Sequence, residues 1–208
     1  EARVSAHTPL ASNTSNFAIG SMAQGLQHPQ RLVGMHFFMP AHLVPLVEVI
    51  SSEHTRPALA EWTVDVLKRL GKMPIWVKKD IPGFVGNRLQ HAMTREALYL
   101  MEDGVVSAEE IDMAVRYGFG FRFMACGPML QKEMSGWDTN QRVGAALFPH
   151  LHNEPCFPPG MARMVQQGHI GMKSLRGIWE WTETSANETK AEIERRLQAA
   201  LALLKAQS

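Results

Sequence analysis

The sequence predicts an α/β sheet followed by an all-helical domain, and three observations lead to this fold class. Up to about residue 80, short apolar runs typical of strands alternate with stretches of helical periodicity. Beyond that point helical signals predominate. The segment DIPG, Asp80–Gly83, separates the two patterns and contains the proline and glycine typical of a break. We therefore predict a sheet-containing part over residues 1–82 and a helical domain over residues 83–208.

The sheet-containing part begins with a short strand and a short helix. The strand is predicted at Pro9–Asn13 and ends in a polar cluster, and the helix at Phe17–Gly25 has Ser15 or Asn16 as a candidate N-cap. Apolar runs then predict two strands, Leu32–Phe38 and Leu46–Ile50.

A longer helix and a last strand complete this part. Thr55 is a candidate N-cap, Pro57 suits the first turn, and Gly71 suits the position after the helix. The run PIWV, Pro74–Val77, predicts a strand. The apolar side chains at helical spacing are Leu59, Trp62, Val66, Leu67 and Leu70.

The second part contains a series of helical signals. Ser107 and Glu110 form a capping box for a short helix that ends near Tyr117. The segment Ile178–Thr182 alternates like an extended strand. Helices are predicted at Phe84–Asp103 with the apolar stripe Val85, Leu89, Ala92, Met93 and Leu100, from Pro128 to Trp137 or further, from Pro159 or Gly160 to Gln167, and at Asn187–Ala206.

The composition is that of an ordinary globular protein. Of 208 residues, 45% are hydrophobic, and the net charge is +1 with both signs interleaved. This argues against a dedicated nucleic-acid or membrane-surface binder. No apolar run approaches the ~20 residues of a membrane-spanning helix, and the N-terminus lacks the apolar core of a signal peptide. Two isolated cysteines, Cys126 and Cys156, favour a reducing cytoplasm.

Two polar residues lie in otherwise apolar strands. His36 is in GMHFF and Glu48 is in LVEVI, so both side chains are expected in a region with little water. If the strands are adjacent, the carboxylate can hold one imidazole nitrogen and leave the other as a general base. The alternative, which spacing alone favours, is a buried polar pair that satisfies itself.

Further polar residues are candidates for binding. The cluster Ser12–Asn16 follows a strand, where ligands bind in open α/β sheets, although an N-cap and turn is the simpler interpretation. Asn87, in a first helical turn, can hold a carbonyl oxygen or be a plain helix-start residue. Lys173 can meet a phosphate or be a solvated lysine, and Arg122 can pair with a carboxylate or anchor its loop.

Neither a metal site nor a glycine-rich phosphate loop is predicted. His150 and His152 lie close together, but no cysteine or HExxH pattern accompanies them. The glycine-bearing stretches GSMAQG and GFGF do not follow a first strand and open a helix, as a dinucleotide fingerprint does.

Several segments in consistent order resemble the L-3-hydroxyacyl-CoA dehydrogenase family, from about residue 9 to residue 182. They are LASNTSNFAI, RLVGMHFFMP, LVPLVEVI, LGKMPIWVKKDIPGFVGNRL, EDGVVSAEEIDMAV and GMKSLRGIW. The resemblance implies the C-terminal portion of a Rossmann-type nucleotide-binding domain followed by a helical, 6-phosphogluconate-dehydrogenase-like domain. The helical domain would bind substrate and form a homodimer.

The resemblance also implies an activity and roles for residues. The family oxidises the 3-hydroxyl of an L-3-hydroxyacyl-CoA to the keto form with NAD, as in the beta-oxidation of fatty acids. NADP is not excluded as the cofactor of this chain. His36 would be the general base and Glu48 its electrostatic support. Ser15 would contact substrate and cofactor, Asn87 would hold the substrate carbonyl, and Lys173 would lie near the cofactor.

The chain departs from the family pattern at three places. Met39 replaces the asparagine of HFFNP, which normally contacts the cofactor. The stretch GFGFRFMACGP is similar to relatives acting on free hydroxy acids, namely L-gulonate 3-dehydrogenase with lambda-crystallin and carnitine dehydrogenase. There Arg122 would bind a substrate carboxylate.

The third departure is the place where the chain begins, because the GxGxxG unit of the family would precede residue 1. We therefore expect a fragment of a longer protein, or a chain whose missing half is present separately, and in either case a chain that is inactive alone. A non-catalytic crystallin-like role, or a role as a dimerisation module, is the remaining alternative.

Overall fold

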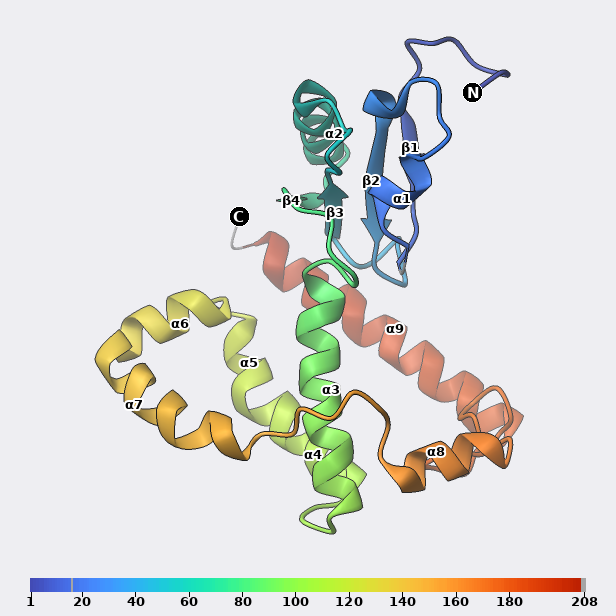
Figure 1. Cartoon of the computed structure of the whole chain (residues 1–208). Coiled ribbons are helices and arrows are strands. Elements are labelled where there is room, and N and C mark those ends of the chain that lie inside the picture. The colour runs from blue at the N-terminus through green and yellow to red at the C-terminus, as the bar shows by residue number, and fades with distance from the viewer. Residues whose placement is uncertain (16, 207–208) are drawn as a thin grey trace. The chain divides into compact units, whose positions relative to one another are not determined.

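The computed structural model describes residues 1–15 and 17–206, which form two compact units. The first contains residues 1–90 and the end of the chain from residue 194, and the second contains residues 91–193. Figure 1 shows strands and helices in the first unit and helices joined by loops in the second. This division falls inside a helix, so the boundary expected near residue 82 stays a prediction.

The first unit contains a four-stranded sheet in the order β1-β2-β3-β4. β1 pairs with β2 in parallel, β2 with β3 antiparallel, and β3 with β4 in parallel. The strands are β1 (Leu10–Ser12), β2 (Leu32–Phe37), β3 (Leu46–Ile50) and β4 (Met73–Val77). All four lie where the apolar runs predicted them, and the predicted α/β sheet is confirmed.

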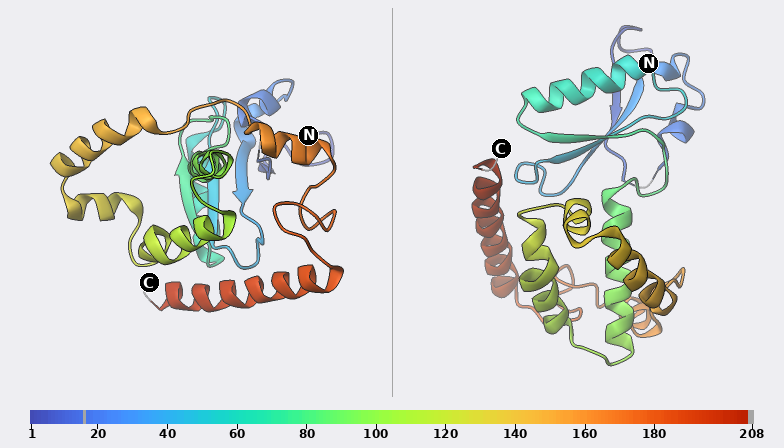
Figure 2. Two further views of the ribbon diagram at one scale, coloured as in Figure 1. Left: turned by 90° about the horizontal axis from the view of Figure 1, so that it is seen from below. Right: turned by 90° about the vertical axis from the view of Figure 1, so that its left-hand side faces the viewer.

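One helix covers each face of this sheet, as two views show (Figures 1 and 2). Side chains alternate between faces along a strand, and the buried residues accordingly form two clusters. One cluster, on the side of α1 (Ile19–Ala23), contains Ile19, Ala23, Leu32, Ile50, Val77 and Phe84. The other, on the side of α2 (Pro57–Arg69), contains Val33, Val47, Val49, Leu59, Ala60 and Leu67.

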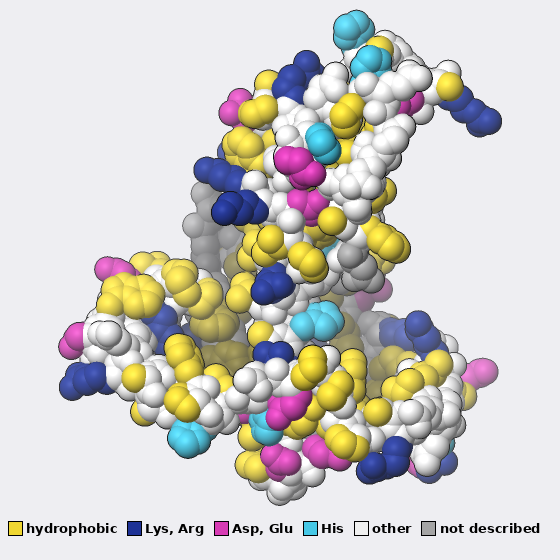
Figure 3. Space-filling view, viewed as in Figure 1, with side chains coloured by type: hydrophobic (Ala, Val, Ile, Leu, Met, Phe, Trp, Pro, Cys, Tyr) yellow, Lys and Arg dark blue, Asp and Glu magenta, His cyan; other side chains and the backbone are white. Residues whose placement is uncertain are grey.

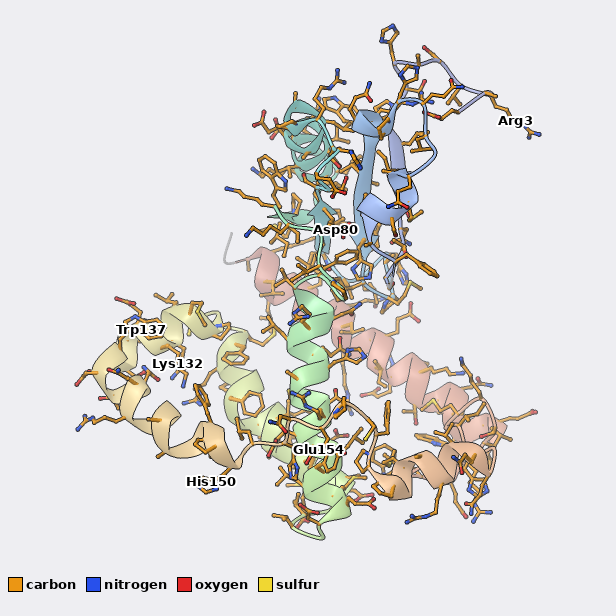
Figure 4. The ribbon with its side chains drawn as sticks, viewed as in Figure 1. Arg3, Asp80, Lys132, Trp137, His150 and Glu154 are labelled. Atoms are coloured by element: carbon orange, nitrogen blue, oxygen red, sulfur yellow. The ribbon has the colours of Figure 1, made fainter. Side chains whose placement is uncertain are left out.

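Gly34 allows α1 to lie close to the sheet. A Cβ atom at this position would come within 2.8 Å of Ile50 Cβ and 2.9 Å of Ile19 Cγ1. A second contact holds the N-terminal end of α1, since Asp80 Oδ2 accepts a hydrogen bond of 2.7 Å from Gly20 N. Asp80 lies between β4 and the following helix (Figure 4). The position of α1, and of the loop that precedes it, is therefore determined by contacts distant in sequence.

Two predicted helix caps in the first unit are wrong. α1 begins at Ile19 after Ala18, without a side-chain cap, so Ser15 does not cap it, and Asn16 lies outside the described residues. α2 begins after Arg56 rather than Thr55. The Thr55 hydroxyl instead donates to Leu32 O at 2.8 Å. In both cases the hydroxyl takes part in a tertiary contact that local capping rules do not include.

The apolar face of α2 also differs from the predicted one. The buried side chains are Leu59, Ala60, Thr63 and Leu67, whereas Trp62 is 51% and Leu70 is 71% exposed. The Thr63 hydroxyl donates to Leu59 O at 2.8 Å, which satisfies it inside the helix. A threonine thus occupies part of the face that the larger apolar residues were expected to fill.

The helices after the sheet agree with the predicted all-α domain. The Ser107 and Glu110 capping box is confirmed at the start of α4. A break at Gly136, with φ of 85°, divides one predicted helix into α6 and α7. The strand expected at Ile178–Thr182 is wrong, because this segment forms a turn bridged between Arg176 and Glu180. The helices are α3 (Gly86–Glu102), α4 (Ala108–Ala114), a π-helical turn (Val115–Phe119), α5 (Gly120–Phe123), α6 (Pro128–Ser135), α7 (Trp137–Leu147), α8 (Pro159–Gln166) and α9 (Glu183–Lys205).

Large apolar side chains of these helices are exposed. On α3, Leu89 and Met93 belong to the predicted stripe but are 65% and 42% exposed. Figure 3 shows hydrophobic side chains gathered over α6. Exposed positions from α5 to the end of α7 include Phe121, Met129, Leu130, Met134, Trp137, Val143 and Leu147. Both buried apolar clusters of the described residues lie in the first unit.

A loop of the second unit is bound to α3 by hydrogen bonds and a ring contact. We call residues 151–160 the strap; Glu154, at its middle, lies along α3 in Figure 4. His152 N donates to Glu96 Oε2 at 2.8 Å, and Gly160 N donates to Glu102 Oε1 at 2.9 Å. The rings of His152 and Tyr99 stack with centroids 4.5 Å apart. The strap is thus held to α3 at both ends.

Tyr99 gives a pH-dependent prediction for this unit. Burial, followed by the hydrogen bond with Cys156, raises the pKa of the Tyr99 phenol above 10.0. A group whose pKa is raised on folding contributes stability below its unfolded value, and this is lost as the pH rises through the folded value. We expect the wild-type melting temperature to fall in that alkaline window, and to fall less in Tyr99→Phe. Tyr117, which is 72% exposed, provides the control Tyr117→Phe; an equal alkaline decline in wild type and Tyr99→Phe would contradict the prediction.

Candidate active site

His36 and Glu48 face each other across β2 and β3. The two residues are directly opposite in the antiparallel register, on the face of the sheet that carries α1. His36 Nδ1 lies 2.8 Å from Glu48 Oε2, and the side chains are only 4% and 0% exposed. The predicted adjacency of the two strands, and the contact between the two side chains, are present in the structure. Their catalytic roles stay a prediction.

The second oxygen of Glu48 is bound at the start of α3. Oε1 accepts hydrogen bonds from Val85 N and Gly86 N, each of 2.9 Å. Backbone N–H groups at a helix N-terminus favour a negative charge, and such charge-assisted bonds offset the cost of burying a carboxylate. Glu48 is therefore fully engaged, with one oxygen on the imidazole and the other on two backbone donors.

This arrangement fixes which nitrogen of His36 carries the proton. An ionised carboxylate only accepts hydrogen bonds, so Nδ1 donates to Glu48 and Nε2 of the neutral ring is an acceptor. Nε2 lies 3.0 Å from Ser15 Oγ, whose hydroxyl donates to it. The three side chains form one chain of hydrogen bonds in which Nε2 is the basic atom.

Ser15 reaches His36 because β1 and β2 are parallel and end at the same edge. Ser12 pairs with Gly34 at the end of β1. Asn13 Oδ1 then accepts a 2.9 Å hydrogen bond from Phe37 N, which ties the following loop to the end of β2. Ser15 itself is exposed although His36 is buried. The basic nitrogen is therefore approached from solvent by way of the Ser15 hydroxyl.

Sequence reasoning missed several residues around the dyad. The ring centroids of Phe38 and Phe84 lie 4.8 Å and 5.6 Å from that of His36. Phe84 is buried and has a φ of 48°, which non-glycine residues rarely adopt. The only available signal was the turn-forming Pro82-Gly83 before it, and this does not reveal a contact with His36.

The remaining predicted residues are placed as follows. Asn87 is partly buried in the first turn of α3, next to Gly86. Arg122 is exposed in α5, and Lys173 is exposed in a turn closed by the bridge between Gly171 and Arg176. The structure brings Ser15, His36 and Glu48 together. Arg122 and Lys173 belong to the second unit, and their roles stay predictions.

The edge formed by β1 and β2 suits the nicotinamide end of a dinucleotide. Ligands of open α/β sheets bind beyond the carboxyl ends of strands, where this chain presents the neutral groups of Asn13 and Ser15. The charge of Glu48 is directed inward to Val85 and Gly86. The contact of Ser15 with a cofactor stays a prediction. Among residues 1–15 and 17–206 no group of three or more metal-binding side chains is present.

Comparison with known families agrees with this geometry. Residues 1–81 match the NAD binding domain of 3-hydroxyacyl-CoA dehydrogenase, and residues 83–181 match the C-terminal domain of the same family. The chain belongs to the 3-hydroxyacyl-CoA dehydrogenase family. The predicted combination of a Rossmann-like sheet and a helical domain is confirmed, and residues 1–81 are part of an NAD-binding domain.

Relatives of this chain are dehydrogenases of different substrates. A 5-formyl-3-hydroxy-2-methylpyridine 4-carboxylate 5-dehydrogenase of Mesorhizobium japonicum is 35% identical over 197 residues, which cover 95% of this chain and 64% of that enzyme. An L-carnitine dehydrogenase of a Pseudomonas species is 39% identical over 133 residues, covering 64% of this chain and 41% of that enzyme. The chain thus spans less than two thirds of the length of either relative.

Solved structures give the same family. The crystal structure of a 5-formyl-3-hydroxy-2-methylpyridine 4-carboxylic acid 5-dehydrogenase, an NAD-dependent dismutase, has a TM-score of 0.94 at 34% identity, covering 97% of this chain and 65% of that one. The (S)-3-hydroxybutyryl-CoA dehydrogenase of Ralstonia eutropha has a TM-score of 0.64 at 34% identity, covering 84% of this chain and 61% of that one. Within the described residues, no helix combines the length and hydropathy needed to span a membrane.

Proposed function

We propose that this chain carries the proton-transfer groups of an NAD-dependent dehydrogenase that interconverts a 3-hydroxyl and a 3-keto group. The observation that carries the proposal is the chain of hydrogen bonds from Ser15 Oγ through both nitrogens of His36 to Glu48. It leaves a basic nitrogen at the sheet edge where α/β domains bind nucleotide cofactors. NAD, when bound, supplies the hydride acceptor.

The residues of the chain would act on the substrate hydroxyl. His36 Nε2 takes its proton, and Ser15 bonds the same oxygen and keeps it beside the imidazole. The positive charge that develops on His36 is stabilised by Glu48, which is itself held by two backbone donors. In the reverse direction the imidazolium returns the proton to the keto oxygen. Asn87, in the first turn of α3, would hold the substrate carbonyl.

Two substrate classes are supported by different observations. An L-3-hydroxyacyl-CoA, as in beta-oxidation, is favoured by the two matching family domains. A free hydroxy acid is favoured by the carnitine and pyridine-carboxylate relatives, and by the exposed guanidinium of Arg122 in α5. Arg122 would pair with the substrate carboxylate in the second case.

The two classes are separated by assaying NADH formation by the full-length gene product with (S)-3-hydroxybutyryl-CoA, L-carnitine and L-gulonate. For a free acid, Arg122→Ala is expected to raise KM about tenfold to a hundredfold, as the loss of a charged hydrogen bond implies. Arg116→Ala, also exposed and nearby in sequence, is the control. Oxidation of the thioester alone, with no effect of Arg122→Ala, would assign the acyl-CoA. No turnover with any of the three would favour the crystallin-like or dimerisation role.

We also propose that a second copy of the chain covers the exposed apolar side chains of α6 and α7, which would make the protein a homodimer. Met134 and Trp137 are 79% and 52% exposed there, and an apolar surface of this kind usually marks an interface. Light scattering tests this by comparing molar masses: Met134→Glu is expected to be a monomer and the wild type a dimer.

We also propose a cytoplasmic location, which the free thiols of Cys126 and Cys156 support.

A further inference from the structure

One backbone position links both partners of the dyad. Gly86 N donates to Glu48 Oε1 at 2.9 Å, at the first residue of α3. A Cβ atom on Gly86 would overlap with Cζ of Phe38 and lie 3.1 Å from its Cε1. The space beside Gly86 is therefore occupied by the Phe38 ring, which in turn contacts the imidazole of His36.

The Phe38 ring packs against the imidazole of His36 and restricts its motion in directions that the two hydrogen bonds restrict less. Hydrogen bonds to Ser15 and Glu48 act on the two nitrogens within the plane of the His36 ring, and they resist displacement out of that plane less strongly. Phe38 and Phe84 contact the ring at interplanar angles of 58° and 56°. An aromatic ring within about 6 Å also attracts a cation, which favours the imidazolium formed during turnover.

We propose that Gly86 and Phe38 are a matched pair of positioning residues for His36. The absence of a side chain at position 86 allows the Phe38 ring to lie against the imidazole, and the same residue supplies a donor to Glu48. The inference rests on the proposed role of His36 as the base. It assigns a function to a glycine and a phenylalanine that need not touch substrate or cofactor.

A double-variant cycle on the full-length gene product tests the pair. Gly86→Ala is expected to lower kcat about tenfold to a hundredfold, with KM changed less than about threefold, because small misplacements of a catalytic group are costly. Phe38→Leu is expected to lower kcat about tenfold, since the imidazole loses the aromatic ring packed against it. In the Phe38→Leu background, Gly86→Ala should cost less than about threefold more, because the overlap no longer exists. Gly127→Ala, where an added Cβ meets nothing within 4 Å, is the control.

A spectroscopic measurement separates this proposal from the proposed function. The NMR signals of the His36 ring, identified by their absence in His36→Gln, should shift in both single variants because the Phe38 ring current changes. Shifted signals without turnover in the wild type would overturn the proposed function and the catalytic role of the pair with it, although Phe38 would still be shown to pack against His36. Additive effects on kcat together with unshifted signals would overturn the positioning role. The double variant keeps the test decisive if Gly86→Ala alone does not fold.

Discussion

Replacing His36 by glutamine in the full-length gene product is expected to lower kcat by about a hundredfold to ten-thousandfold, the usual contribution of a general base. Glutamine can still contact Glu48 and Ser15, but it has no nitrogen that takes up a proton at neutral pH. Substrate binding depends on other groups, so KM should change much less than kcat. Steady-state NADH kinetics with the substrate identified by the panel above provide the measurement.

The matched control for this variant is His54→Gln. His54 also contacts a carboxylate, Glu53 Oε1 at 3.4 Å, but its side chain is 41% exposed. Surface pairs of this kind contribute little, and we expect His54→Gln to retain the wild-type kcat. An equal kcat for His36→Gln and the wild type would remove His36 from the mechanism.

Replacing Glu48 by glutamine is expected to reduce kcat by about a thousandfold or more through the tautomer of His36, as an acid-to-amide change does in serine proteases. The glutamine carbonyl can replace Oε1 as the acceptor for Val85 N and Gly86 N. Its NH2 group then points at Nδ1, which must become the acceptor, so that the proton moves to Nε2. The nitrogen that faces Ser15 would no longer be basic.

Glu48→Ala distinguishes this electrostatic effect from a structural one. Alanine leaves two partly buried backbone donors and the buried imidazole without their acceptor. Because removing one member of a buried polar pair is costly, the free energy of unfolding should fall by about 3–5 kcal/mol. Chemical denaturation of both variants, with exposed Glu53→Gln as the control, measures this difference. Glu48→Gln should remain close to wild type in stability; a wild-type kcat for Glu48→Gln would exclude the tautomer argument.

The sequence predicted the sheet and the His36–Glu48 contact well because both follow from local patterns. The strand β3 was predicted with the same bounds, Leu46–Ile50, from a run of apolar residues. Two strands joined by a short connection usually pair, and the observed register places His36 opposite Glu48. By contrast, the hydrogen bonds from Val85 N and Gly86 N to Glu48 depend on where the turn before α3 places its first residues. Strand and helix periodicity contain no information about that position.

Arg122 and Lys173 are the least defined of the predicted site residues. Their residue types made them candidates with simpler alternatives, the family resemblance gave them roles, and each lies in the second unit. The apolar stripe of α3 was read correctly as helical, but Leu89 and Met93 are exposed. Helical periodicity identifies an apolar face and does not identify what covers it.

Two backbone N–H groups at the start of α3 donate to Glu48, so the first turn of this helix helps to hold the acid–base pair in place. α3 continues from the first unit into the second, so the carboxylate that orients His36 is also the N-terminal anchor of the helix that connects them. The amide protons of Val85 and Gly86 can exchange with solvent deuterium only when Glu48 Oε1 releases them. Their exchange rates therefore measure how often the hydrogen bonds to Glu48 open, and they can be measured without substrate, cofactor or turnover.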